Sequence, residues 1–175
     1  MKSFDEIYET LPGMGWLSRD EAELLWKTVN ETQGPILEVG CYHGRSSVLL
    51  ASTGRTLYCV DPFEGFSTED PTGEETRKAW HRNIDDRGLE RHVWLSRQRI
   101  EDWQVKPVGF AYLDGDHTSQ GTENQIQVAI RCGAAVIAIH DVNDSGDGLH
   151  IRDTALRILG PWVARVERIA VWRLK

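Results

Sequence analysis

Short apolar runs rich in β-branched and aromatic residues alternate with helical patterns along this chain of 175 residues. Such alternation is typical of an α/β fold, a mostly parallel sheet with helices on both faces. The expected strands are 36–39, 56–60, 92–95, 108–113 and 135–139, followed by a hairpin of 162–166 and 169–174 that adds an antiparallel strand at the edge. The expected helices between them are 44–52, 74–86, 119–131 and 151–159.

A single domain is expected over residues 1–175, because the length suits one domain and no linker or internal repeat interrupts the chain. Residues 1–33 are expected to form a helical N-terminal segment. Within it, Ser18 and Glu21 have the spacing of a capping box that begins a helix, and Gly34 followed by Pro35 ends that helix.

Charge and composition exclude several classes of partner. The net charge is −7, with acids and bases interspersed and no basic stripe, so no nucleic-acid partner is expected. The sequence shows neither a signal-peptide pattern nor a segment long enough to span a bilayer, so no membrane partner is expected. The three cysteines lack metal-ligand spacing and are expected to be reduced thiols, which favours a cytoplasmic location.

Residues 36–46, Ile-Leu-Glu-Val-Gly-Cys-Tyr-His-Gly-Arg-Ser, form an apolar strand that passes through a glycine-rich turn into a helix. Glu38 is expected to close the strand, and Gly40 and Gly44 to let the backbone approach a ligand. Ser46 falls in the first helical turn, where unpaired N–H groups favour an anionic ligand group. This segment predicts a site for a nucleoside-bearing cofactor.

The residue at position 42 indicates which kind of cofactor the turn binds. A dinucleotide turn has the pattern Gly-x-Gly-x-x-Gly, whose second glycine lets the backbone touch a pyrophosphate. Tyr42 occupies that second position, so a nicotinamide dinucleotide is disfavoured. An ordinary turn between strand and helix, with glycines present only for packing, stays open as an alternative.

Ionisable residues follow most of the expected strands, at the sheet edge where open α/β sheets bind ligands. Asp61 lies 21 positions after Gly40, and its carboxylate can accept both hydrogen bonds of a ribose diol. The alternative is that Asp61 and Pro62 only begin a turn.

The Asp114-Gly-Asp-His117 turn follows the fourth strand, so Asp114 is expected to face the reactive end of a ligand. The alternative is a solvated acidic turn that caps the next helix. His140 and Asp141 follow the fifth strand and reach the same region, although His140 is also interpretable as a hydrogen-bonded histidine without a direct role.

Four motifs occur together and in order: Leu37–Ser46, Val60–Phe63, Leu113–His117 and His140-Asp141. In this the chain resembles class I S-adenosylmethionine-dependent methyltransferases, and it is similar to the small bacterial family that contains macrolide sugar O-methyltransferases and cephalosporin hydroxylase-like proteins. Its glycine turn resembles motif I of the catechol O-methyltransferase group. The resemblance implies a Rossmann-like sheet of seven strands and an enzyme that methylates a small-molecule acceptor from S-adenosylmethionine, most often on a hydroxyl oxygen.

The resemblance also implies roles for individual residues. His117 would be the base that takes the acceptor proton, since a neutral imidazole suits that step near neutral pH, and Asp114 would border the reacting centre. Tyr42 would hold the methionine end, Asp61 the ribose, and Pro62 with Gln98 the adenine. The full set of implied cofactor-binding residues is Glu38, Gly40, Tyr42, Gly44, Ser46, Asp61, Pro62, Gln98 and Asp114.

The resemblance also raises the possibility of a bound divalent metal ion. Relatives place such an ion on the fourth-strand acid, the fifth-strand acid and the residue after it. Asp114 and Asp141 match, but Val142 stands where an Asn or Asp is expected, and Asn143, Asp144 and Asp116 are candidate replacements. Two alternatives follow: Mg²⁺ on Asp114 and Asp141, or no metal.

The acceptor is expected to contact residues 64–76, the segment around Trp16 and residues 143–150. Its pocket would be open to solvent or closed by a second subunit of a homo-oligomer. The sequence does not choose between O- and N-methylation or among acceptors. Two other functions stay open: a non-catalytic S-adenosylmethionine- or nucleoside-binding protein, and an iron-dependent hydroxylase of the same fold.

Overall fold

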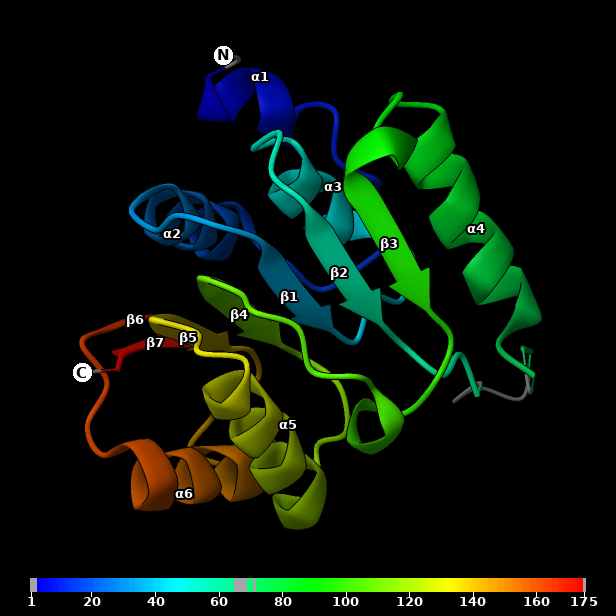
Figure 1. The fold of residues 1–175 in the computed structure, drawn as a ribbon. Helices are drawn as coiled ribbons and strands as arrows, with labels where there is room; N and C mark the ends of the chain where they lie inside the picture. Colours follow the sequence, from blue (N-terminus) through cyan, green and yellow to red (C-terminus); the bar gives the residue numbers. More distant parts are fainter. Residues whose placement is uncertain (1–2, 65–68, 71, 175) are drawn as a thin grey trace.

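The computed structural model describes residues 3–64, 69–70 and 72–174 (Figure 1). Within these ranges the strands form one sheet of seven, in the order β3-β2-β1-β4-β5-β7-β6. The strands are β1 (Ile36–Val39), β2 (Leu57–Val60), β3 (Val93–Ser96), β4 (Phe110–Leu113), β5 (Val136–Ile139), β6 (Ala164–Val166) and β7 (Ile169–Arg173). The helices are α1 (Phe4–Tyr8), α2 (Arg19–Asn30), α3 (Arg45–Ala51), α4 (Glu74–Asp85), α5 (Ser119–Arg131) and α6 (Asp147–Leu159), with short 3-10 helices η1 (Glu90–His92) and η2 (Ile100–Asp102).

The predicted fold class is confirmed. The first five strands pair in parallel, β7 pairs antiparallel with β5, and β6 pairs antiparallel with β7. The central strands β1, β4 and β5 are buried along their whole length, as expected for strands covered on both faces.

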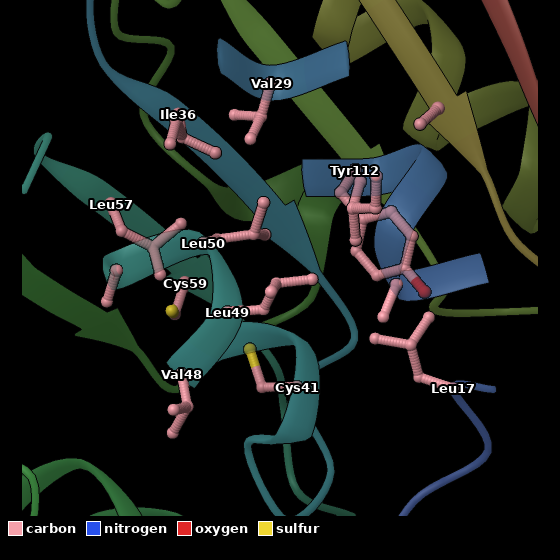
Figure 2. Close-up of a cluster of buried hydrophobic side chains, with 14 of the residues drawn as sticks. Leu17, Val29, Ile36, Cys41, Val48, Leu49, Leu50, Leu57, Cys59 and Tyr112 are labelled. Carbon is pink, nitrogen blue, oxygen red and sulfur yellow. The ribbon is translucent and has the colours of Figure 1, made fainter. Parts of the chain in front are cut away.

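Alternate residues of the central strand β1 belong to two separate apolar layers. Ile36 of β1 packs with α1, α2, α3 and α4 on one face, and Figure 2 shows part of this layer, in which Leu49 and Leu50 of α3 lie near β1. Leu37, one residue further along, faces α5, α6 and η2 on the other side (Figure 1). The period-two alternation of a strand thus assigns its residues to the two layers.

Local sequence explains most helix starts, and it also explains where the expectations fell short. Ser18 and Glu21 form the predicted capping box of α2. Ser3 and Glu6 form a second box that begins α1, a helix that was not placed individually. The last helix begins at Asp147 instead of 151, because Gly148 fits closely against Asn143 and lets the helix start earlier.

The sheet order places the site. The chain passes from β1 outward through β2 to β3, then returns to β4 on the opposite side of β1. A ligand crevice is expected outside the carboxyl ends of strands at such a reversal. Among the described residues, no helix has both the length and the apolar composition needed to cross a lipid bilayer.

Candidate active site

A cavity of about 530 Å³ lies at the carboxyl ends of β1, β2, β4 and β5. Its volume is in the range of small-molecule and cofactor sites. The predicted site residues that line it are Gly40, Tyr42, Ser46, Asp61, Pro62, Asp114, His117 and Asp141, and His140 also lines it. Glu38, Gly44 and Gln98 do not belong to this lining.

The two glycines of the turn make room for protein atoms. Gly40 has a φ of 82°, and a Cβ there would overlap the backbone carbonyl of Asp114. Gly44 begins α3 with a φ of 85°, and its Cβ would lie 3.0 Å from the ring of Trp80. Both glycines therefore have a packing role, only Gly40 of the two also lines the cavity, and their approach to a ligand stays a prediction.

Glu38 lies buried behind the turn and holds the first turn of α3. Its two carboxylate oxygens accept hydrogen bonds from the hydroxyls of Ser46 at 2.5 Å and Ser47 at 2.6 Å, and the Cys59 thiol donates at 3.2 Å. Burial raises the pKa of Glu38 to about 7, against the lowering effect of these hydrogen bonds. Glu38 supports the turn from the protein side, and it does so through Ser46.

Tyr42 lies at the mouth of the cavity with a left-handed backbone, at a φ of 46°. Its ring centroid is 5.1 Å from that of Trp16, which comes from the segment before α2. The Trp16 side chain is 62% exposed and also lines the cavity. An aromatic rim therefore borders the opening on this side.

Asp61 joins the end of β2 to the turn after β1. One oxygen accepts the backbone N–H groups of Cys41 at 2.7 Å and Tyr42 at 3.2 Å, and the other accepts the N–H of Phe63 at 2.8 Å. The bond from Phe63 is the local turn contact of the alternative interpretation. A carboxylate has about four acceptor positions, so these bonds leave Asp61 little capacity for a ribose diol unless one of them opens.

A cluster of two acids and two histidines occupies the other end of the cavity. Nδ1 of His140 lies 3.4 Å from Oδ1 of Asp114 and 3.5 Å from Oδ2 of Asp141. Nε2 of His117 lies 3.8 Å and 3.7 Å from the same two oxygens. The structure thus brings together the residues that follow β4 and β5 in the sequence.

The cluster shifts the pKa values of its members. Burial would raise the pKa of Asp114, but His140 and His117 lower it to about 2. Burial would lower the pKa of His140, but Asp114, Asp141 and Glu21 raise it to about 12. The hydrogen bond to Asp114 raises the pKa of His117. Asp114 is therefore held in its charged form by the two neighbouring histidines.

Two residues behind the cluster were not identified from the sequence. Glu21 of α2 is fully buried, and its Oε2 lies 3.4 Å from Nε2 of His140. Arg168, in the turn between β6 and β7, donates to Oδ1 of Asp141 at 3.0 Å. The capping-box pattern located Glu21 but gave no sign of this second role, and no local pattern marks Arg168.

The remaining expectations divide as follows. Where the adenine is expected, Arg99, Ile100 and Glu101 line the cavity, and Gln98 does not. Val142 is fully buried, and Asp144 is exposed and pairs with Arg152 at 2.7 Å. Neither residue reaches the cluster, and none of residues 143–150 lines the cavity.

Asp116 lies just before α5, where its Oδ1 accepts the N–H of Thr118, the N-cap residue of that helix, at 2.8 Å. In the acceptor loop, Glu64, Gly73 and Thr76 line the cavity, whereas residues 65–68 and 71 lie outside the described residues.

Comparisons with known proteins agree with this geometry. Residues 37–142, more than half of the chain, match the model of a family described as a methyltransferase domain. No curated protein matches the chain.

Solved structures share the fold at low identity. An O-methyltransferase from Bacillus cereus in complex with S-adenosylhomocysteine is 17% identical, with a TM-score of 0.64 over 98% of this chain and 90% of that one. CalS11, a TDP-rhamnose 3′-O-methyltransferase of calicheamicin biosynthesis, is 15% identical, with a TM-score of 0.62 over 97% and 91%. TomG from Streptomyces achromogenes, an O-methyltransferase of tomaymycin synthesis in complex with S-adenosylmethionine, is 16% identical, with a TM-score of 0.61 over 90% and 78%.

Proposed function

The chain belongs to the methyltransferase-domain family whose model matches residues 37–142, and from this premise we propose that it transfers a methyl group from S-adenosylmethionine to a hydroxyl oxygen of a small molecule. One observation carries the proposal: the turn after β1, Asp61 and the acidic cluster around Asp114 open into one cavity. The bound ligands of the Bacillus cereus enzyme and of TomG support the cofactor. The O-methyltransferase activities of the similar structures support the hydroxyl acceptor.

The cofactor would lie across the carboxyl ends of β1 and β2. Its methionine end would contact Gly40, Tyr42 and Ser46, which line one side of the cavity. Its ribose would approach Asp61, with one of the backbone bonds to that carboxylate exchanged for a ribose hydroxyl. Its adenine would contact apolar lining from Phe63 and Ile100, both almost fully buried.

The methyl group would then face Asp114 and His117. When bound, S-adenosylmethionine would supply the methyl group for in-line transfer to the acceptor oxygen, with neutral S-adenosylhomocysteine as the product. Nε2 of His117 takes the hydroxyl proton, because this side chain is 40% exposed toward the cavity and stands within 3.8 Å of both acids. Alignment of the reactants supplies roughly 7–11 kcal/mol in favourable cases, and the base adds about 10²–10⁴-fold in rate.

The cluster also fits a divalent metal. Donor atoms of Asp114, His140 and Asp141 all lie within 4.8 Å of one another, and buried Nδ1 of His140 has no hydrogen-bond partner in the described part of the chain. Asp114, His140 and Asp141 would hold the ion. A bound divalent ion polarises an acceptor hydroxyl and makes its proton easier to remove.

A transfer assay tests this proposal. The purified protein is incubated with S-adenosylmethionine labelled in the methyl group and with separate panels of sugars, phenols, amines and short RNAs, and S-adenosylhomocysteine is quantified. We expect label on hydroxyl-bearing small molecules. Label found only on amines or on RNA would overturn the acceptor class, and no transfer to any panel would overturn the activity.

A further inference from the structure

His140 differs from the other members of the cluster because its imidazole is buried without a hydrogen bond. Its side chain is 2% exposed, and neither ring nitrogen has a hydrogen-bond partner in the described part of the chain. A buried polar group left unpaired costs about 1–3 kcal/mol. Three carboxylates face His140 at 3.4–3.5 Å without hydrogen-bond geometry, and a metal ion between Nδ1 and two of them would satisfy this nitrogen.

The unpaired nitrogen is directed at two carboxylate oxygens. Nδ1 of His140 lies 3.4 Å from Asp114 Oδ1 and 3.5 Å from Asp141 Oδ2. Donor atoms bonded to one metal ion at about 2.0–2.2 Å are separated by roughly 3–4 Å. The two distances from Nδ1 match the spacing that one bound ion requires, and the three donor atoms all lie within 4.8 Å of one another.

The other face of His140 is directed at Glu21. Oε2 of this fully buried acid is 3.4 Å from Nε2 of His140. The acid is fixed in place by the backbone N–H groups of Ser18 at 2.9 Å and Arg168 at 3.0 Å. A histidine that binds a metal usually directs its second ring nitrogen at a carboxylate, which sets the tautomer and the ring orientation. Glu21 is placed to hold the proton on Nε2, so that Nδ1 is the metal-binding atom once an ion displaces its proton.

Asp141 is oriented in a similar way. Arg168 donates to Oδ1 of Asp141 at 3.0 Å, which leaves Oδ2 directed at His140. His117 stands at 3.7 Å from that same Oδ2, on the cavity side. His117 Nε2 also lies 3.8 Å from Oδ1 of Asp114, so the proposed base borders the same two carboxylates.

From these contacts we propose that Asp114, His140 and Asp141 form a site with two carboxylates and one imidazole that prefers a divalent transition-metal ion, such as Mn²⁺, Fe²⁺, Co²⁺ or Zn²⁺, over Mg²⁺. Mg²⁺ is bound almost entirely by oxygen ligands, whereas imidazole suits the transition metals. Glu21 is the positioning residue of the site. This inference rests on the proposed function for the location of the reacting groups, but its test needs no turnover.

Calorimetry on protein treated with EDTA and then freed of chelator tests the preference. CoCl₂, MnCl₂ and MgCl₂ are titrated separately, and the visible absorption of Co²⁺ is recorded. We expect Co²⁺ and Mn²⁺ to bind at one site at least about tenfold more tightly than Mg²⁺, with a Co²⁺ spectrum that reports a nitrogen ligand. Equal or tighter binding of Mg²⁺, or no binding of any ion, would overturn the proposal even without a variant.

Variants assign the preference to His140. We expect His140→Ala to lose Co²⁺ binding, His140→Asp to bind Mg²⁺ in preference, and Glu21→Gln to weaken Co²⁺ binding by about tenfold or more. His92→Ala, a change at an exposed histidine far from the cavity, is the matched control and keeps wild-type binding. Unchanged Co²⁺ affinity in His140→Ala would contradict the assignment.

Titration of the same samples with S-adenosylhomocysteine separates this inference from the proposed function. If the protein binds S-adenosylhomocysteine but shows no preference among the metal ions, the metal inference is wrong and the proposed function stands. If the protein binds Co²⁺ as expected but does not bind S-adenosylhomocysteine, the proposed function is wrong and the metal inference stands. Thermal melting of each variant identifies any change that acts only through unfolding.

Discussion

His117 shows at the scale of a single residue how binding and chemistry are divided in this site. It lines the cavity beside Asp114 and Asp141, whereas the turn after β1 and Asp61, the two elements proposed to hold the cofactor, are bonded to each other. We expect His117→Ala to lower the turnover number by about 100-fold or more and to leave the affinity for S-adenosylhomocysteine within about twofold. Steady-state kinetics and calorimetry measure the two quantities.

His92→Ala serves as the control for that change, because His92 is exposed at a distance from the cavity. Turnover by His117→Ala equal to that of the control would remove His117 from the mechanism.

Glu38 makes stability depend on pH in a defined window. Its pKa is 4.5 in an unfolded reference and about 7 in the buried site. Between these values the folded state holds more protons, so the Glu38 contribution to stability falls as the pH rises and is constant above the folded pKa. The total fall is about 3 kcal/mol.

Glu38→Gln should remove this fall. Urea unfolding between about pH 5 and 8 measures it as the difference between wild type and variant, and exposed Glu90→Gln provides the control. A difference that does not change with pH would show that Glu38 titrates as it does in the unfolded chain.

At the scale of elements, the join between β1 and β4 depends on Gly40. A Cβ at Gly40 would overlap the Asp114 carbonyl, so an alanine must separate the ends of two central strands. Gly54 has a similar φ of 74°, but nothing lies within 4 Å of its Cβ position. We expect Gly54→Ala to cost about 1–2 kcal/mol from backbone strain alone, and Gly40→Ala to cost at least about 2 kcal/mol more.

Urea unfolding of the two alanine variants measures that difference. Equal losses would show that the two strand ends can separate without cost.

The helices and strands also show how much of the structure can be predicted from the sequence. Sequence patterns located the seven described strands, and the mostly apolar runs of β1, β4 and β5 are those that burial on both faces requires. The short helix η2 was not expected, and it brings Ile100 and Glu101 into the cavity where Gln98 had been predicted. Contacts such as that between Glu21 and His140 join distant parts of the chain, and no local pattern encodes them.

At the scale of the whole molecule, the N-terminal segment forms one wall of the site. Arg168 donates to the backbone carbonyl of Trp16 at 3.0 Å, and the Trp16 ring lies against Tyr42 at the mouth of the cavity. We expect Trp16→Ala to raise the acceptor KM by about fivefold or more through loss of an aromatic contact, with the KM for S-adenosylmethionine unchanged. Initial-rate kinetics measures both constants.

Trp94 provides a control for Trp16. It is 63% exposed, as much as Trp16, but lies on β3 and does not line the cavity. A Trp94→Ala effect on the acceptor KM as large as that of Trp16→Ala would show that the loss is not local to the site.

The central claim is that the cavity seats S-adenosylmethionine between the turn after β1 and Asp61. The most direct measurement is calorimetric titration of the protein with S-adenosylhomocysteine, repeated with NAD and with Asp61→Asn. Exposed Asp86→Asn is the control. The account predicts saturable binding of one S-adenosylhomocysteine per chain, no binding of NAD, and a loss of about tenfold or more in Asp61→Asn alone. No heat from S-adenosylhomocysteine, or equal affinity in both variants, would contradict it.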